Sequence, residues 1–177
     1  MIAVAYEKRQ FKVKNYLSLK FDFQGRIGQT VKDTENYLLS MLGNDCQTTN
    51  PTEQHKILFA LKGFGNLGRP LDAIPLIMDC VTNGKHINIS IAAIKSMRKM
   101  SLSEDTRHEL AEIMGDQNAD LEKRVEVFNL LMQDPSEQDI IFAIDIAHDL
   151  EDMTQLRSYI STYLKSAIQN KLPSHKK

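Results

Sequence analysis

The chain has no tryptophan, and only five prolines and two cysteines occur in its 177 residues. Few prolines leave long segments free to form helices, and two cysteines are too few for a disulfide framework that replaces a hydrophobic core. No apolar run approaches the ~18 residues that a membrane-spanning helix needs. The composition therefore predicts an all-α protein that is not transmembrane.

An excess of charge of one sign is also absent. The net charge is −1, so we expect no electrostatic attraction to nucleic acid or to an anionic membrane surface. The hydrophobic fraction of 42% and the charged fraction of 25% are typical of a globular domain. The opening residues, MIAVAYEKRQ, lack the pattern of a signal peptide, so a secretion signal would lie outside this chain.

Motifs for catalysis and metal binding are missing as well. There is no G-x-S-x-G elbow, Walker loop, C-x-x-C or H-E-x-x-H pattern. The carboxylates beside His148 are interpreted as the solvated face of a helix. We predict a protein that is not an enzyme and has no cofactor and no metal. The histidines are scattered through the chain, at His55, His86, His108, His148 and His175.

What is present is helical periodicity from about residue 30 onward. Asn50 followed by Pro51 predicts a helix start, and Glu53 stands three residues after Asn50, in capping-box spacing. Ser103 predicts a second start, and Ser136 with Asp139 predicts a third. Residues 1–29 are less clear, so we expect a poorly defined segment there, a helical-repeat domain over 30–170 and a tail over 171–177.

The predicted helix starts recur near residues 52, 87, 120 and 152, a period of about 33. Each unit reads as a helix, a short turn and a second helix. Such a period predicts a solenoid, in which each unit buries its apolar face against its neighbours. The alternative is a non-repeating bundle with helices of similar length.

Three glycines, Gly63, Gly65 and Gly68, form a literal G-x-G-x-x-G. A dinucleotide loop must follow a strand within a βαβ unit, whereas the preceding EQHKILFALK has helical spacing. We therefore place Gly63 and Gly65 at a close approach between helices, and Gly68 at a helix C-cap before Pro70.

Four segments in order resemble the helical domain of the large lipid transfer proteins, the family of vitellogenins, apolipophorins, apolipoprotein B and the microsomal triglyceride transfer protein. HKILFALKGFGNLGRP, residues 55–70, is similar to the family's LKALGNxGxP. Phe64 stands where the family usually has alanine, and Lys62–Gly63 alters its small-residue pattern. The sequences of these motifs are most similar to those of the apolipophorin and apolipoprotein B branch. The other three segments resemble the family through Ala92, Ala93, Arg98 and Met100, through Glu122, Arg124 and Pro135, and through Gln155, Ser161 and Leu164.

This resemblance implies a right-handed, two-layered superhelix that wraps lipid-holding β-sheets. It implies extracellular lipid transport, with this chain as a structural wall and the β-sheet domains of the same protein as partners. The lipid, held by the full-length protein, would be phospholipid, diacylglycerol or another neutral lipid. The alternative function is that of an intracellular helical-repeat scaffold that binds another protein on its concave face.

Two modifications bear on the compartment. Cys46 and Cys80 lie 34 residues apart, and composition alone favours buried thiols. The family resemblance instead implies a bond between them, which requires an oxidising compartment. Asn88-Ile89-Ser90 is an N-glycosylation sequon, but the triplet is a weak signal, and a helix cap or a solvated residue is the favoured interpretation of Asn88.

Two apolar stripes near the C-terminus are interpreted as repeat core. The alternative is that part of them remains as a face in contact with lipid or with the sheets. The residues of this candidate face are Ile140, Phe142, Ile144, Tyr159 and Tyr163.

Overall fold

The computed structural model describes residues 26–43, 46–68, 73–149 and 154–171. These residues are all-helical, which confirms the predicted class. Contacts divide the chain into two compact units, Met1–Met41 and Leu42–Lys177. The predicted domain boundaries at 29/30 and 170/171 stay predictions, and residues 1–25, Pro70 and 172–177 lie outside the described residues.

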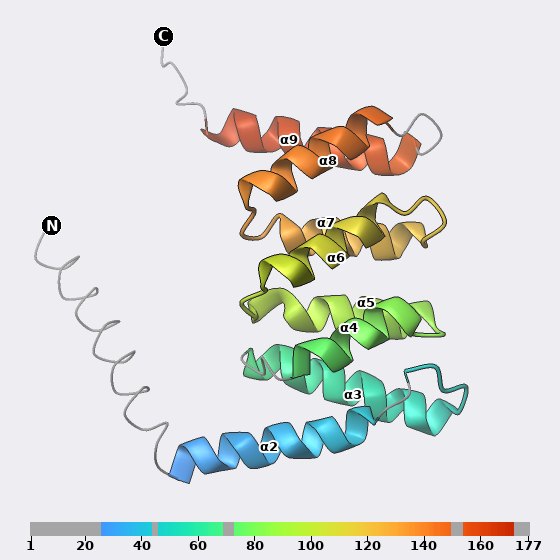
Figure 1. Cartoon of the computed structure of the whole chain (residues 1–177), viewed down its shortest axis with the longest axis vertical. Coiled ribbons are helices and arrows are strands. Elements are labelled where there is room, and N and C mark those ends of the chain that lie inside the picture. The colour runs from blue at the N-terminus through green and yellow to red at the C-terminus, as the bar shows by residue number, and fades with distance from the viewer. Residues whose placement is uncertain (1–25, 44–45, 69–72, 150–153, 172–177) are drawn as a thin grey trace, which may run out of the picture. The chain divides into compact units, whose positions relative to one another are not determined.

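The first unit contains α2, Arg26–Leu42, apart from its last residue, and this helix begins before the predicted start of helical periodicity at about residue 30. The second contains α3 to α9, cyan to red in Figure 1. Their bounds are α3 Pro51–Leu67, α4 Ile74–Asn83, α5 Ile87–Ser96, α6 Glu104–Gly115, α7 Leu121–Leu131, α8 Glu137–Asp149 and α9 Thr154–Lys171, with a 3₁₀ turn, η2, at Met97–Lys99.

The predicted caps explain where several helices begin. The Asn50 side chain accepts from the Thr52 amide at 2.9 Å, and Pro51 occupies the first turn of α3, as predicted. Ser103 caps α6 through the Thr106 amide. Glu53 departs from the capping-box pattern, because its carboxylate pairs with Lys56 at 2.8 Å, while the Asn50 amide donates to Thr48 Oγ1.

Helices of the second unit form two layers. In one layer α3 packs on α5, α5 on α7 and α7 on α9; in the other, α6 packs on α8. Consecutive helices pack together most closely in the pairs α4–α5, α6–α7 and α8–α9. The predicted units, by contrast, paired each odd-numbered helix with the helix after it, for example α5 with α6. The reason lies in the connections: a short turn joins α4 to α5, whereas η2 and an extended segment separate α5 from α6.

The core lies between these layers and follows the predicted 3.6-residue stripes. In α3, Ile57, Leu61 and Phe64 are buried at helical spacing. In α7, Val127, Phe128 and Leu131 are buried in the same way. Each layer thus covers the apolar face of the other, which is why none of these helices needs strong intrinsic helix propensity.

Two of the motif glycines have the structural roles predicted for them. Gly68 ends α3 with a left-handed φ of 67°, and its amide donates to the Phe64 carbonyl at 2.9 Å. A Cβ added at Gly65 would lie 3.2 Å from Ser96 Cα, so α3 and α5 approach closely there. Gly63 lies half-buried within α3, and its predicted close approach stays a prediction.

Gly65→Val is therefore expected to lower the free energy of unfolding by about 2 kcal/mol, because the backbone of Ser96 cannot yield as a side chain would. Urea unfolding followed by circular dichroism measures this. Asn66→Val is the control, since it places the same β-branched residue at the next, exposed position of α3. Equal losses in both variants would show that a β-branched side chain anywhere in this turn of α3, and not the close approach to Ser96, sets the effect.

Candidate functional site

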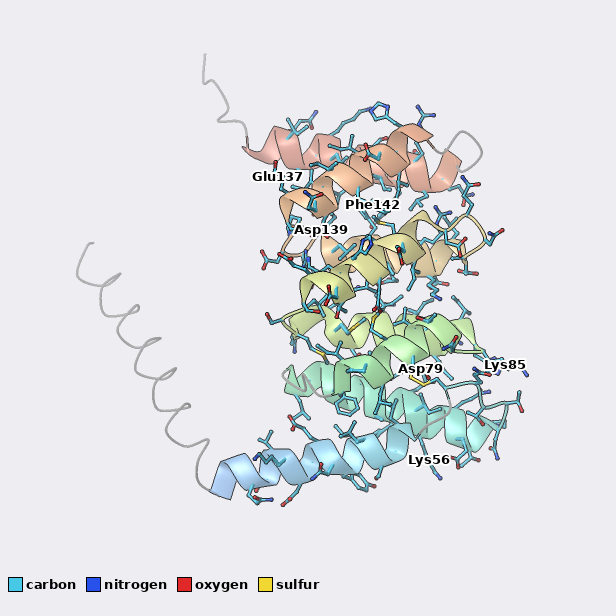
Figure 2. All side chains as sticks on the ribbon, viewed as in Figure 1. Lys56, Asp79, Lys85, Glu137, Asp139 and Phe142 are labelled. Carbon is cyan, nitrogen blue, oxygen red and sulfur yellow. A yellow bond between two sulfur atoms is a disulfide. The ribbon has the colours of Figure 1, made fainter. Side chains whose placement is uncertain are left out.

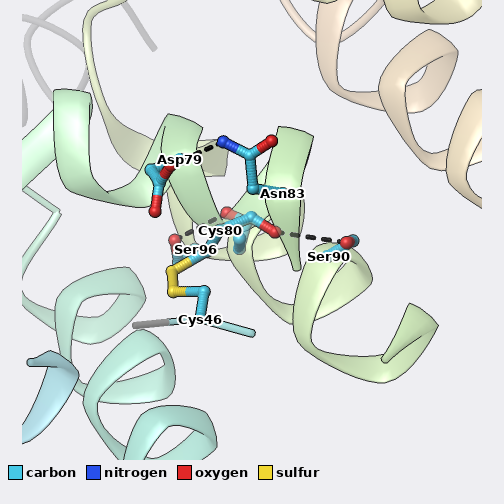
Figure 3. Close-up of a disulfide and its surroundings, with 7 residues drawn as sticks. Cys46, Asp79, Cys80, Asn83, Ser90 and Ser96 are labelled. Carbon is cyan, nitrogen blue, oxygen red and sulfur yellow. Dashed lines mark hydrogen bonds between the residues drawn. A yellow bond between two sulfur atoms is a disulfide. The ribbon is translucent and has the colours of Figure 1, made fainter. Parts of the chain in front are cut away.

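The most constrained corner of the second unit surrounds a disulfide. Cys46, in the turn before α3, is bonded to Cys80 of α4, and their Cα atoms are 5.1 Å apart, within the usual range for a disulfide. Figure 3 shows the bond beside the hydrogen bond from Ser90 Oγ to the Cys80 carbonyl, which is 3.1 Å long. The Lys85 amide donates to the Cys46 carbonyl at 3.3 Å. The corner therefore ties the start of α3 to α4 and α5.

Asn88 lies exposed in the first turn of α5, next to this corner. The N-cap of α5 is His86, so the structure favours a solvated residue over a cap at Asn88. Glycosylation of Asn88 stays a prediction. The sequon's third residue, Ser90, is buried and engaged with Cys80.

Most other residues of the family motifs lie on the odd-numbered helices or in the turn that follows α5. Ala93 is fully buried in α5 and Ala92 half-buried, while Arg98 lies exposed in η2. Arg98 Nη2 is 2.8 Å from Glu126 Oε2 of α7, and Lys95 Nζ is 3.4 Å from Glu126 Oε1. Sequence reasoning missed Glu126, because nothing local marks a residue whose partners lie one repeat earlier.

Arg124 is the largest fully buried side chain in this part of the chain. Its Nε donates to the Met114 carbonyl near the end of α6 at 2.8 Å. Neither Nη atom has a hydrogen-bond partner among the described residues. Burial lowers the pKa of Arg124, and the nearby Asp116 carboxylate opposes that shift.

The five residues of the candidate apolar face do not form one surface. Ile140, Ile144 and Tyr163 line a groove of about 700 Å³ between α8 and α9. Phe142 points elsewhere, towards α6, where a Cβ on Gly115 would come within 3.3 Å of its ring. Tyr159 and Tyr163 both set their rings edge-on against Phe128, with centroids 5.8 and 5.1 Å apart.

Both tyrosines also have polar partners on the preceding pair of helices. Tyr159 Oη donates to Asn129 Oδ1 at 2.8 Å, and Tyr163 Oη donates to the Met132 carbonyl at 3.1 Å. Their rings therefore take part in the contact between α7 and α9, although both side chains remain partly exposed. The sequence showed their spacing but not these partners.

A second polar cluster joins α6 to α8. Asp139, 4% exposed, accepts hydrogen bonds from Arg107 Nε at 3.1 Å and from the Ser136 amide at 2.7 Å and hydroxyl at 2.6 Å. Arg107 Nη2 also contacts Asp139 and donates to the Asp134 carbonyl at 2.8 Å. The capping-box spacing predicted the Ser136–Asp139 contact; it could not reveal Arg107.

The ionisation of Asp139 follows from these contacts. Burial by itself would raise the pKa of Asp139, but the hydrogen bonds from Arg107 and Ser136 and the charge of Arg107 outweigh burial and hold the pKa below its ordinary value of 3.8. A carboxyl group with a depressed pKa stabilises the folded state fully above its unfolded pKa, and that contribution is lost as the pH falls through the folded value.

Asp139→Asn is accordingly expected to lower the free energy of unfolding by about 2 kcal/mol at pH 7, because it breaks a largely buried charge pair. The difference in the free energy of unfolding between the variant and the unmodified protein should shrink as the pH falls below 3.8. Urea titrations at successive pH values measure it. Asp145→Asn, on the exposed side of α8, should leave stability unchanged, and a pH-independent gap at position 139 would contradict the assignment.

Neither a metal site nor a membrane span is apparent in the described ranges. No group of three or more histidine, cysteine, aspartate or glutamate side chains gathers there in a way that could hold an ion. None of the helices described is long and apolar enough to cross a membrane.

Comparison with known proteins tests the resemblance to the large lipid transfer proteins. The vitellogenin TPR domain family matches residues 4–165, and the chain belongs to that family. This confirms the resemblance to the helical domain of the large lipid transfer proteins. No solved structure matches the chain significantly.

Three curated relatives match most of this chain. Rat apolipoprotein B-100 is 23% identical over 146 residues and human apolipoprotein B-100 25% identical over 148, covering 79% and 80% of this chain. The apolipophorins of Drosophila melanogaster are 24% identical over 123 residues, or 68% of the chain. The chain spans 3–4% of the length of these relatives.

Proposed function

We propose that the chain is a structural helical domain of a lipid-transport protein, in which it supports or shields β-sheets that hold the lipid. Family membership carries this proposal. The apolipoprotein and apolipophorin relatives favour secretion, and the Cys46–Cys80 bond suits an oxidising compartment. We expect phospholipid, diacylglycerol or another neutral lipid to be held by the full-length protein, and no catalytic activity in this domain.

The finer architecture proposed with it is a right-handed superhelix with a period of about 33 residues. Its support is the spacing of the odd-numbered helices, which begin at Pro51, Ile87, Leu121 and Thr154, that is 36, 34 and 33 residues apart. The layered contacts of α3, α5, α7 and α9 also favour a solenoid.

The chemistry of the odd-numbered layer favours a protein neighbour over lipid. Exposed Lys95 and Arg98 reach Glu126, and exposed Tyr159 reaches Asn129, so polar bonds cross from α5 to α7 and from α7 to α9. Such side chains would lose hydration against acyl chains, whereas a sheet's polar side chains could accommodate them. We therefore place lipid on the sheets and not on this layer.

Co-expression in insect cells tests the proposal. The tagged chain would be secreted together with Drosophila apolipophorins from which the matching segment has been deleted. We expect recovery of a complex that carries lipid, measured by mass spectrometry of the extract, whereas the chain secreted alone carries none. A non-reduced digest should contain the peptide that links Cys46 to Cys80.

The intracellular scaffold remains the second candidate. Free thiols at Cys46 and Cys80 in secreted material, together with no binding to the apolipophorin domains, would favour it. A protein partner on the odd-numbered layer would then be sought by crosslinking.

A further inference from the structure

A groove of about 610 Å³ runs between α6 and α8, in the layer of even-numbered helices. Its size lies within the range of sites that enclose a small ligand or a few side chains of a peptide. Both of its walls are described helices within the stack, so the groove is not a feature of a chain end. Figure 2 labels Glu137, Asp139 and Phe142 on α8, beside α6.

The base of this groove is fixed and electrically neutral. Arg107 of α6 and Asp139 of α8 pair there, and Arg107 Nη2 also donates to the Asp134 carbonyl. This pairing holds the two helices at a set separation. It also occupies the only guanidinium that lines the groove, so Arg107 is not available to an anionic ligand.

The rim of the groove, by contrast, carries carboxylates that form no ion pair among the described residues. Glu104, Glu137 and Asp145 line the groove, are exposed, and form no ion pair among the described residues. His108 lies on the same rim, but its Nε2 is directed to Glu112, 3.6 Å away. Three carboxylates along one cleft lower its electrostatic potential and attract cationic groups.

Apolar side chains lie between these charges. Ile141 is 44% exposed although it lines the groove, and Ala111 and the half-buried Phe142 continue the apolar surface beside it. An exposed apolar side chain surrounded by polar and charged groups matches the general plan of a protein–protein interface, which has an apolar centre and a polar rim.

We infer that the α6–α8 groove binds a cationic segment of another protein, with one apolar side chain against Ile141 and its basic side chains at Glu104, Glu137 and Asp145. Charge complementarity selects this occupant: an acidic peptide or an anionic membrane would meet three carboxylates with no available cation. This function is additional to the structural role proposed above and does not depend on lipid.

Fluorescence anisotropy of the whole chain with a labelled synthetic peptide, in which arginines flank a single leucine, tests the inference. The E137Q/D145N variant should weaken binding about tenfold, because two rim charges are neutralised without a change of shape. Ile141→Ser should weaken it about as much. Binding should also fall as salt is raised.

Two matched controls make the test specific. E109Q/E122Q changes the net charge equally, but Glu109 faces the α4 side of α6 and Glu122 lies on α7. Ile168→Ser removes an exposed isoleucine from α9. Both controls should bind as the unmodified chain does. Equal loss in a control, no binding of the peptide, or equal binding of a peptide with glutamate in place of arginine would overturn the inference, as would stronger binding to anionic phospholipid vesicles.

Discussion

The C46A/C80A variant is expected to unfold with a free energy about 3–4 kcal/mol lower than that of the oxidised protein. The bond joins residues 34 positions apart, so it removes the entropy of a loop of that length from the unfolded chain. Both cysteines are buried, so alanine adds a small cavity to this loss. Urea unfolding, monitored by circular dichroism, measures the difference.

Reduction of the unmodified protein separates the two contributions. Dithiothreitol breaks the bond but leaves both sulfur atoms in place, so reduced protein should be more stable than C46A/C80A and less stable than oxidised protein. If reduction leaves the unfolding midpoint unchanged, the bond does not constrain the unfolded chain and the expected stabilisation is wrong.

Arg124→Ala is expected to cause a loss of similar size, about 3–4 kcal/mol. It empties a fully buried site at the contact of α6 with α7 and removes the donor to the Met114 carbonyl. Arg124→Met also removes the donor to the Met114 carbonyl, yet it should lose no more than about 1 kcal/mol. Methionine fills most of the same volume and removes a buried charge whose two Nη groups have no partner in the described structure.

The comparison of the two variants decides what Arg124 does. A methionine variant near the unmodified stability would show that the aliphatic stem provides most of the stabilisation, as the packing suggests. Methionine and alanine variants of equal instability would contradict this and would assign the stabilisation to the guanidinium, whose Nε donates to the Met114 carbonyl. Chemical unfolding at neutral pH gives both values.

Helix positions could be predicted because their signals are local. Asn50 and Ser103 cap helices through atoms two or three residues away, so a single sequence contains both donor and acceptor. The buried stripe of Ile57, Leu61 and Phe64 repeats within one helix. The left-handed Gly68 was predictable for the same reason, since it stands at the end of that stripe.

The sequence did not predict in this way which helices pack together or which side chains share a surface. Arg107 meets Asp139 across 32 residues, and Glu126 meets Arg98 across 28, so no local pattern marks either pair. The candidate apolar face failed as a unit because Phe142 and Ile144, two residues apart on α8, point into different grooves. Periodicity gives the angle of a side chain about its helix, but not which neighbouring helix lies at that angle.

The hydrogen bond between Ser90 and the Cys80 carbonyl constrains any glycosylation of Asn88. A glycosylating enzyme reads the hydroxyl of the sequon's third residue together with the asparagine. In the folded domain that hydroxyl is buried, although Asn88 itself remains exposed. Any glycan at Asn88 must therefore be attached before the α4–α5 corner closes, so slower folding of this corner should raise the occupancy of Asn88, and early closure should leave the site bare.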